Sequence, residues 1–260
     1  MRDSVNQQYL LREAVTGVDV VFHLIWTTIP EVANRDPAGD VSANLIPTIR
    51  LFEVCRNVGV RRIVFVSSGG TVYGPAQTWP VSEAHPQNPI NSYGITKLAA
   101  EKYLYMFRHL YGVDYVIFRP SVPYGPRQNP LAAQGAVAVF LYRVARGLPV
   151  TIWGDGSVVR DYFYVSDLTS ALVAGAERAS PEQRVFNLGG GNAVSLIQLL
   201  GMVEEVVGKR ANVEYAPPRR FDAPQILLDT NLARQELGWQ PKVRLTDGLV
   251  QTWKWMSITI

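Results

Sequence analysis

The chain has 260 residues, of which 47% are hydrophobic, so it can bury one large core or a core with a smaller domain beside it. Lysine and arginine total 25 against 22 for aspartate and glutamate, and this net charge of +3 is not gathered into any basic run, which excludes a nucleic-acid-binding signature. No signal-peptide core and no stretch of about 18 uncharged apolar residues occurs, so we expect a cytoplasmic protein without membrane contacts.

Short apolar runs alternate with longer amphipathic segments along the chain. This alternation is typical of a parallel sheet with helical crossovers, and strands that are apolar throughout suit burial on both faces. We therefore predict an α/β fold with a doubly wound, Rossmann-like parallel sheet. The predicted strands are Asp19–Leu24, Arg62–Val66, Tyr115–Arg119, Val150–Trp153 and Val185–Leu188, and the predicted helices between them are Tyr9–Val15, Val41–Val58, Ser92–Tyr111, Leu131–Arg146 and Val165–Ala179.

After about Pro120 the pattern changes, because prolines and glycines separate shorter elements. Further helices are predicted at Leu196–Val207 and Asn231–Leu237, followed by an amphipathic tail at Leu245–Trp255. We interpret residues 1–165 as a dinucleotide-binding domain. Residues 166–260 are predicted to form mainly a smaller, mixed substrate-binding domain that is interleaved with the first.

Neither cysteine nor histidine suggests a metal site. Cys55 is the single cysteine and lies in an apolar helical pattern, which predicts a buried structural thiol. The three histidines His23, His85 and His109 show no ligand spacing, so no metal is expected.

The strongest local motif is the pair Tyr93 and Lys97. Residues four apart on a helix share one face. A phenol has a pKa near 10, so its use as a base near neutrality requires a neighbouring positive charge, which Lys97 can provide. Alone, the pair would also fit two solvated helix residues.

A second motif follows the predicted strand Arg62–Val66, where the chain reads Ser67-Ser68-Gly69-Gly70-Thr71. Doubly wound folds bind ligands at the carboxyl ends of their strands. A serine at this place could hold a reacting oxygen against the tyrosine, although turns also favour serine and glycine for local reasons.

Taken in order, these motifs and several shorter ones resemble the extended short-chain dehydrogenases that act on nucleotide-activated sugars, the NAD-dependent epimerase/dehydratase family. UDP-glucose 4-epimerase is the most similar type, and the resemblance covers essentially the whole chain. The further matching segments are Val20–Leu24, Asn44, Arg119-Pro120, Tyr124–Gln128, Trp153–Gly156, Arg160–Tyr162, Tyr164–Asp167, Phe186–Gly189 and Leu237–Pro241.

The resemblance implies an epimerase that uses NAD. Tyr93 would take the proton of the sugar's 4-hydroxyl while C4 passes a hydride to the nicotinamide, and Lys97 would hold the nicotinamide ribose and lower the pKa of the tyrosine. The keto sugar would then turn and take the hydride back on its other face. A homodimer through the helices Val41–Val58 and Ser92–Tyr111 is implied as well.

Residue roles follow from the same resemblance. The implied cofactor-binding residues are Leu24, Asn44, Val66, Ser67, Tyr93, Lys97 and Pro120. The implied substrate-binding residues are Ser68, Tyr93, Val122, Arg160, Arg219 and Arg220, with Arg160 and either Arg219 or Arg220 as clamps for the diphosphate of a UDP-sugar. An arginine fork suits phosphate oxygens.

The sequence departs from the family pattern in three places. A glycine-rich turn of the form Gly-x-x-Gly-x-x-Gly is missing, as though roughly sixty residues, or two βα units, were absent ahead of Met1. We therefore expect the chain as given to bind NAD poorly, which a tight, saturable NAD titration would contradict. Gly69 stands where the family has its hydroxyl, so Ser68 is favoured as the substitute and Thr71 stays open. Val122 replaces a common asparagine.

The alternative activity within the family is that of another NDP-sugar dehydratase or reductase. A 4,6-dehydratase needs an acid pair, but the corresponding positions hold Gly70 and Thr71, and the related decarboxylases have a glutamate at the position of Thr71. Epimerisation is therefore favoured over both. A truncated, non-catalytic relative that acts as a binding subunit is the alternative from another class.

Overall fold

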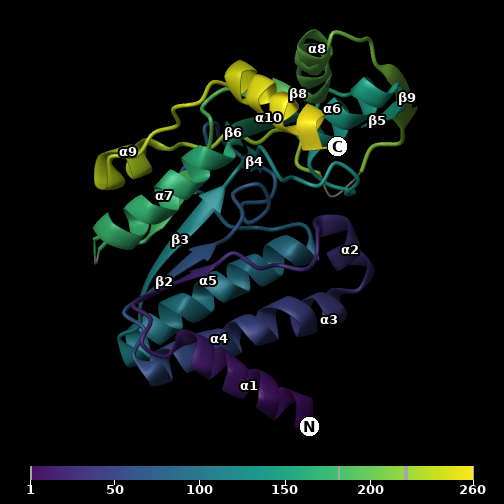
Figure 1. The fold of residues 1–260 in the computed structure, drawn as a ribbon. Coiled ribbons are helices and arrows are strands. Elements are labelled where there is room, and N and C mark those ends of the chain that lie inside the picture. Colours follow the sequence, from purple (N-terminus) through teal and green to yellow (C-terminus); the bar gives the residue numbers. More distant parts are fainter. Residues whose placement is uncertain (1, 181, 220–221, 260) are drawn as a thin grey trace.

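A parallel four-stranded sheet with the order β1-β2-β3-β7 forms one half of the molecule. The computed structural model describes residues 2–180, 182–219 and 222–259 (Figure 1). The strands are β1 (Val20–His23), β2 (Arg62–Val66), β3 (Asp114–Pro120) and β7 (Val185–Leu188), and all neighbours run parallel. Their apolar sequences place them between two helical layers.

Helices cover both faces of this sheet (Figure 1). Apolar side chains of α1 (Arg2–Val15), α4 (Ile46–Val58) and α5 (Ser92–Tyr111) pack with one face of the strands. Those of α7 (Val165–Arg178) and α9 (Asn231–Leu237) pack with the other. The doubly wound architecture is therefore confirmed.

Two short helices and a π-helical turn connect β1 to α4. They are α2 (Pro30–Arg35), α3 (Pro37–Asp40) and η1 (Val41–Leu45). The predicted helix Val41–Val58 thus begins with a π-helical turn, a feature that apolar periodicity does not reveal.

The other half of the molecule contains two small sheets. One has the order β4-β6-β8, and the other pairs β5 with β9. Three helices pack with these sheets around a separate apolar core. The strands are β4 (Val122–Tyr124), β5 (Pro149–Trp153), β6 (Val159–Tyr164), β8 (Ala193–Ser195) and β9 (Asn212–Ala216), and the helices are α6 (Ala136–Arg146), α8 (Leu196–Val207) and α10 (Leu245–Thr259).

Several details differ from the sequence prediction. The helix predicted at Leu131–Arg146 starts only at Ala136, because Gly135 has a left-handed φ of 105° and precedes the first turn. The strands β4, β6, β8 and β9 were not predicted. Although β5 was predicted, it lies outside the large sheet.

The two halves are interleaved in sequence. Strand β7 comes from the range 166–260 but lies in the large sheet, whereas β4, β5, β6 and α6 come from the range 1–165 and lie in the other half. The division at residue 165 stays a prediction. In the described part of the chain, no helix has both the length and the apolar character needed to cross a membrane.

Cys55 is buried, as predicted, and burial raises the pKa of its thiol to about 11.

Candidate active site

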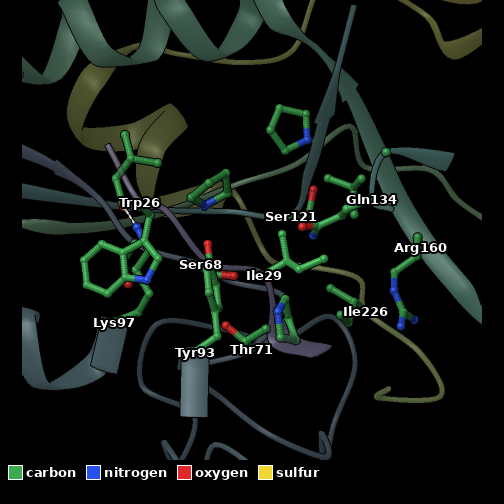
Figure 2. Close-up of a pocket in the computed structure, with 18 of the residues that line it drawn as sticks. Trp26, Ile29, Ser68, Thr71, Tyr93, Lys97, Ser121, Gln134, Arg160 and Ile226 are labelled. Atoms are coloured by element: carbon green, nitrogen blue, oxygen red, sulfur yellow. Dashed lines mark hydrogen bonds between the residues drawn. The ribbon is translucent and has the colours of Figure 1, made fainter. Parts of the chain in front are cut away.

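A cavity of about 550 Å³ opens between the two halves, beyond the carboxyl ends of β1, β2 and β3 (Figure 2). Its walls come from the loops that follow these three strands, from the first turns of α5 and from β6. Ligands of doubly wound folds bind in this position, because the loops there diverge and leave a crevice.

The start of α5 places Tyr93 and Lys97 on the cavity wall. Asn91 caps the helix by accepting a hydrogen bond from the backbone N–H of Gly94 at 2.8 Å, so the helix begins at Ser92. A Cβ atom at Gly94 would lie 2.8 Å from the carbonyl oxygen of Thr71, so glycine is required for this close approach. Tyr93 and Lys97 both line the cavity, as their spacing predicts.

The electrostatics of the pair differ from the prediction. Burial and, secondarily, the charge of Asp40 raise the pKa of Tyr93 to about 12. Burial lowers the pKa of Lys97 to about 7, although Glu101 and Asp40 act in the opposite direction. The ammonium group donates to the carbonyl of Val66 at 2.7 Å. In this state the pKa of the phenol is therefore raised, in contrast to the predicted lowering by Lys97.

Asp40 is a buried carboxylate that joins three segments around the pair. Its Oδ1 accepts hydrogen bonds from Thr28 at 2.6 Å and from Asn44 at 3.0 Å. Its Oδ2 accepts from Ser92 at 3.0 Å and from Thr96 at 2.9 Å. It thus connects the loop after β1, the turn η1 and the first turns of α5.

Asn44, a predicted cofactor residue, is buried and is not part of the cavity wall. Its carboxamide oxygen accepts from the backbone and the hydroxyl of Thr27, at 2.8 and 3.0 Å, and its nitrogen donates to Thr28 and Asp40. In this structure it holds the loop after β1.

The hydroxyl groups after β2 have different roles. Ser67 donates its hydroxyl to buried Glu101. Ser68 and Thr71 line the cavity and lie beside Tyr93 in Figure 2. Gly69 faces the interior instead, because a Cβ atom there would lie 2.4 Å from Leu228 and 2.7 Å from a backbone oxygen. A hydroxyl at position 69 would therefore not reach this cavity.

A buried ion pair that was not predicted from the sequence contacts the cavity wall through Ser67, which donates to Glu101. Arg119 donates to Glu101 through Nε and Nη2, with the shortest distance 2.5 Å, and to the hydroxyl of Tyr73 at 3.0 Å. Tyr73 donates in turn to Asn187 at 2.6 Å. Glu101 lies one turn after Lys97 on α5, and this spacing could have indicated that its carboxylate faces the same side of the helix as Lys97.

Two arginines approach one aspartate on the opposite wall. The guanidinium of Arg160 donates to two backbone oxygens at 2.8 Å and lies 4.0 Å from Asp222. Arg219 forms a closer ion pair with Asp222, at 2.7 Å, and its guanidinium lies 5.3 Å from the ring centre of Trp153. The predicted Arg220 lies outside the described residues.

Ten of the predicted site residues meet in the cavity, and Arg219 lines two neighbouring hollows. The ten are Leu24, Val66, Ser67, Ser68, Thr71, Tyr93, Lys97, Pro120, Val122 and Arg160. Wall residues that were not predicted include Trp26, Thr28, Ile29, Gln134, Asp222 and Ile226. The first three directly follow β1, so their position at the carboxyl end of a strand could have identified them.

The wall fits a dinucleotide's nicotinamide half. Leu24 and Val66 offer apolar contacts at the ends of β1 and β2, and Lys97 brings an ammonium group to the same place. In the described part of the chain, no group of three or more His, Cys, Asp or Glu side chains could hold a metal ion.

A doubly wound sheet with a tyrosine and a lysine one helical turn apart at its carboxyl edge defines a dehydrogenase-type α/β enzyme. The model of the NAD dependent epimerase/dehydratase family matches residues 3–189. The chain therefore belongs to this family.

Relatives and solved structures agree with this membership. A UDP-glucose 4-epimerase of Mycolicibacterium smegmatis is 40% identical over 234 residues, which are 90% of this chain and 74% of the relative. A dTDP-4-dehydro-6-deoxyglucose reductase of Escherichia coli is 34% identical over 90% of this chain and 73% of the relative.

Two crystal structures of UDP-glucose 4-epimerases have similar folds. The Thermotoga maritima enzyme with UDP-glucose has a TM-score of 0.93 and 36% identity, covering 97% of this chain and 82% of its own. The Thermus thermophilus enzyme with NAD has a TM-score of 0.91 and 32% identity, covering 97% and 83%.

Proposed function

We propose that this protein catalyses the NAD-dependent epimerisation of a UDP-sugar at C4. The observation that carries the proposal is the position of Tyr93 and Lys97, on one wall of a cavity at the carboxyl edge of the sheet. The similarity to UDP-glucose 4-epimerases over most of the chain supports it.

The side chains would divide the work as follows. Tyr93 removes the proton of the 4-hydroxyl and returns it, and the ammonium of Lys97 holds the nicotinamide ribose and favours the phenolate. NAD, when bound, supplies the hydride acceptor and donor. Leu24, Val66, Ser67 and Pro120 would line the nicotinamide half.

The opposite wall would hold the nucleotide. Arg160 lines the cavity, and Arg219 lies close to Arg160 because both guanidinium groups contact Asp222. Both guanidinium groups would bind diphosphate oxygens, because the fork of N–H donors matches two oxygens at once. Val122 would contact the substrate through its apolar side chain only.

The direct test incubates the purified protein with NAD and UDP-glucose and then separates the sugar nucleotides. UDP-galactose is the expected product, and Tyr93→Phe should slow its formation about 10² to 10⁴-fold. Tyr9→Phe, at an exposed tyrosine of α1, is the matched control and should be as active as the wild type. A 4-keto-6-deoxy product would indicate a dehydratase, and turnover equal in wild type and Tyr93→Phe would refute the proposal.

We propose Ser68 rather than Thr71 as the hydroxyl that assists Tyr93. The hydroxyl of Thr71 is shielded and has no hydrogen-bond partner among the described residues. Ser68→Ala should therefore lower kcat about tenfold or more, whereas Thr71→Val should retain most of it. The reverse order of effects would assign the role to Thr71.

The finer parts of the proposal concern assembly and location. Ile46, Ile95 and Tyr105 are exposed apolar residues on α4 and α5, which supports a homodimer through these helices. Sedimentation should show a dimer in the wild type and a monomer for Tyr105→Asp. The lone buried cysteine supports a cytoplasmic location, which fractionation of expressing cells would test.

A further inference from the structure

The ammonium group of Lys97 lies in an unusual environment for a buried charge. The residue is 3% exposed, and within the described part of the chain its one hydrogen bond goes to the carbonyl of Val66. Among the described residues, no carboxylate lies within 4.0 Å of this nitrogen. Burial without a direct counterion favours the neutral amine, which would remove the charge that the proposed reaction requires.

Aromatic rings surround the ammonium group instead. Its nitrogen lies 4.0 Å from the ring centre of Trp26, 5.0 Å from that of Phe65 and 5.7 Å from that of Tyr93. A cation within about 6 Å of a ring centre is attracted by the negative face of the ring, and tryptophan attracts it most strongly. Trp26 is thus both the nearest and the most effective of the three rings.

Packing holds the indole ring of Trp26 in this position. Its ring centre lies 6.3 Å from that of Tyr93, in an edge-to-face arrangement, and 6.2 Å from that of Phe65. The buried indole N–H has no partner among the described residues, so no hydrogen bond to the protein accounts for the orientation. Figure 2 shows the ring beside the Lys97 side chain on the cavity wall.

We propose that Trp26 is a positioning residue for the reaction, whose indole face keeps the ammonium group of Lys97 charged and beside Tyr93. This inference rests on the proposed function, because that function gives Lys97 its role. Trp26 acts through Lys97 and takes no part in proton transfer.

Four other titratable groups near Lys97 bear on whether its side chain is charged. Glu101 and Asp40 favour its charged form, and the phenol of Tyr93 is neutral because its pKa is about 12. His23, on β1, has its pKa lowered to about 4, mainly by burial and then by Lys97, so it is uncharged near neutral pH. None of these four residues is replaced in the Trp26 variants, so the variants differ from the wild type in the indole alone.

The test is a pH titration of Lys97 by NMR, without cofactor or substrate, in protein labelled with ¹³C at the lysine ε carbon. The chain has five lysines, and Lys97→Met assigns the signal by removing it. In Trp26→Leu the titration midpoint should fall by about 1 pH unit, because the charged form loses its aromatic partner. Trp26→Phe should retain a ring face and show a smaller fall.

The other four lysines are internal controls, and their midpoints should not move. A Trp26→Leu midpoint equal to that of the wild type would overturn the proposal, as would equal falls in the leucine and phenylalanine variants. If Trp26→Leu does not fold, the wild type still decides: the ε protons of Lys97 should be shifted upfield by the indole ring current, and an ordinary shift would refute the contact.

The outcome is separable from the proposed function. The titration needs no turnover, so an inactive protein can still show the expected midpoints. Conversely, an active epimerase whose Lys97 titrates identically in all variants would retain its function and exclude this role for Trp26.

Discussion

Replacing Glu101 by glutamine tests the buried ion pair beneath the active site. The side chains of Glu101 and Arg119 are each 3% exposed, and three of the guanidinium's hydrogen bonds go to this carboxylate. Glu101→Gln keeps the shape but removes the negative charge, which leaves Arg119 buried without a counterion. Breaking a buried pair in this way costs about 3 to 5 kcal/mol of unfolding free energy.

For a chain of this size, 1 kcal/mol shifts the melting temperature by about 2 to 4 °C, so we expect a loss of about 10 °C in calorimetry. The matched control is Asp247→Asn, whose ion pair with Arg244 is largely exposed to solvent and whose loss should leave the melting temperature close to that of the wild type. Replacing Glu101 and Arg119 together by methionine should recover much of the loss, because no unpaired charge remains. Melting of Glu101→Gln within about 2 °C of the wild type would refute this reasoning.

Two further predictions concern single residues of the large sheet and the loop after β2. Burial lowers the pKa of His23 to about 4, below its unfolded value near 6.5, so the stability it contributes is present above pH 6.5 and is lost as the pH falls towards 4. At pH 5 the loss amounts to about 2 kcal/mol of unfolding free energy. Urea unfolding at pH 7.5 and pH 5 should show a smaller difference in unfolding free energy for His23→Gln than for the wild type. The exposed control His109→Gln should show the same difference as the wild type. Gly69→Ser should destabilise the protein by about 1 to 3 kcal/mol in the same assay, because a Cβ atom there lies 2.7 Å from a backbone oxygen. Gly70→Ser should be tolerated, because the nearest atom to a Cβ there lies at 3.4 Å. Equal losses of stability in the two variants would contradict the packing argument.

The large sheet and the catalytic helix could be predicted because their signals are local. Strand β2 is a run of apolar residues bounded by polar ones, and α5 has both its cap at Asn91 and its terminating Gly112 in the sequence. The spacing of Tyr93 and Lys97 then determines their common face. Pattern and position together were sufficient for this part of the site.

The smaller sheets could not be predicted, because their strands are short and pair with distant segments. Strand β6 has two charged residues followed by three aromatic ones, which is no strand-like alternation, and its antiparallel partner β8 lies about thirty residues later in the chain. The role of Asn44 was likewise not readable. An asparagine at this position of the helix can bind a ligand or hold a loop. Its hydrogen bonds with Thr27 and Asp40, which only the structure shows, assign it to the loop.

The charge balance at Tyr93 also depends on residues that are distant in sequence. Spacing on α5 brings one positive charge to the phenol, but Asp40, more than fifty residues earlier, adds a negative charge that acts on the same phenol. With the phenol at a pKa of about 12 and the ammonium at about 7, the proton resides on Tyr93 in the open cavity, and Lys97 is only partly charged near neutrality. The phenolate thus depends on whatever keeps the ammonium charged. Exclusion of water by a bound substrate would strengthen the attraction between phenolate and ammonium. Substrate binding and the proposed contact of Trp26 with Lys97 would therefore both favour the state with an ionised Tyr93 and a charged Lys97.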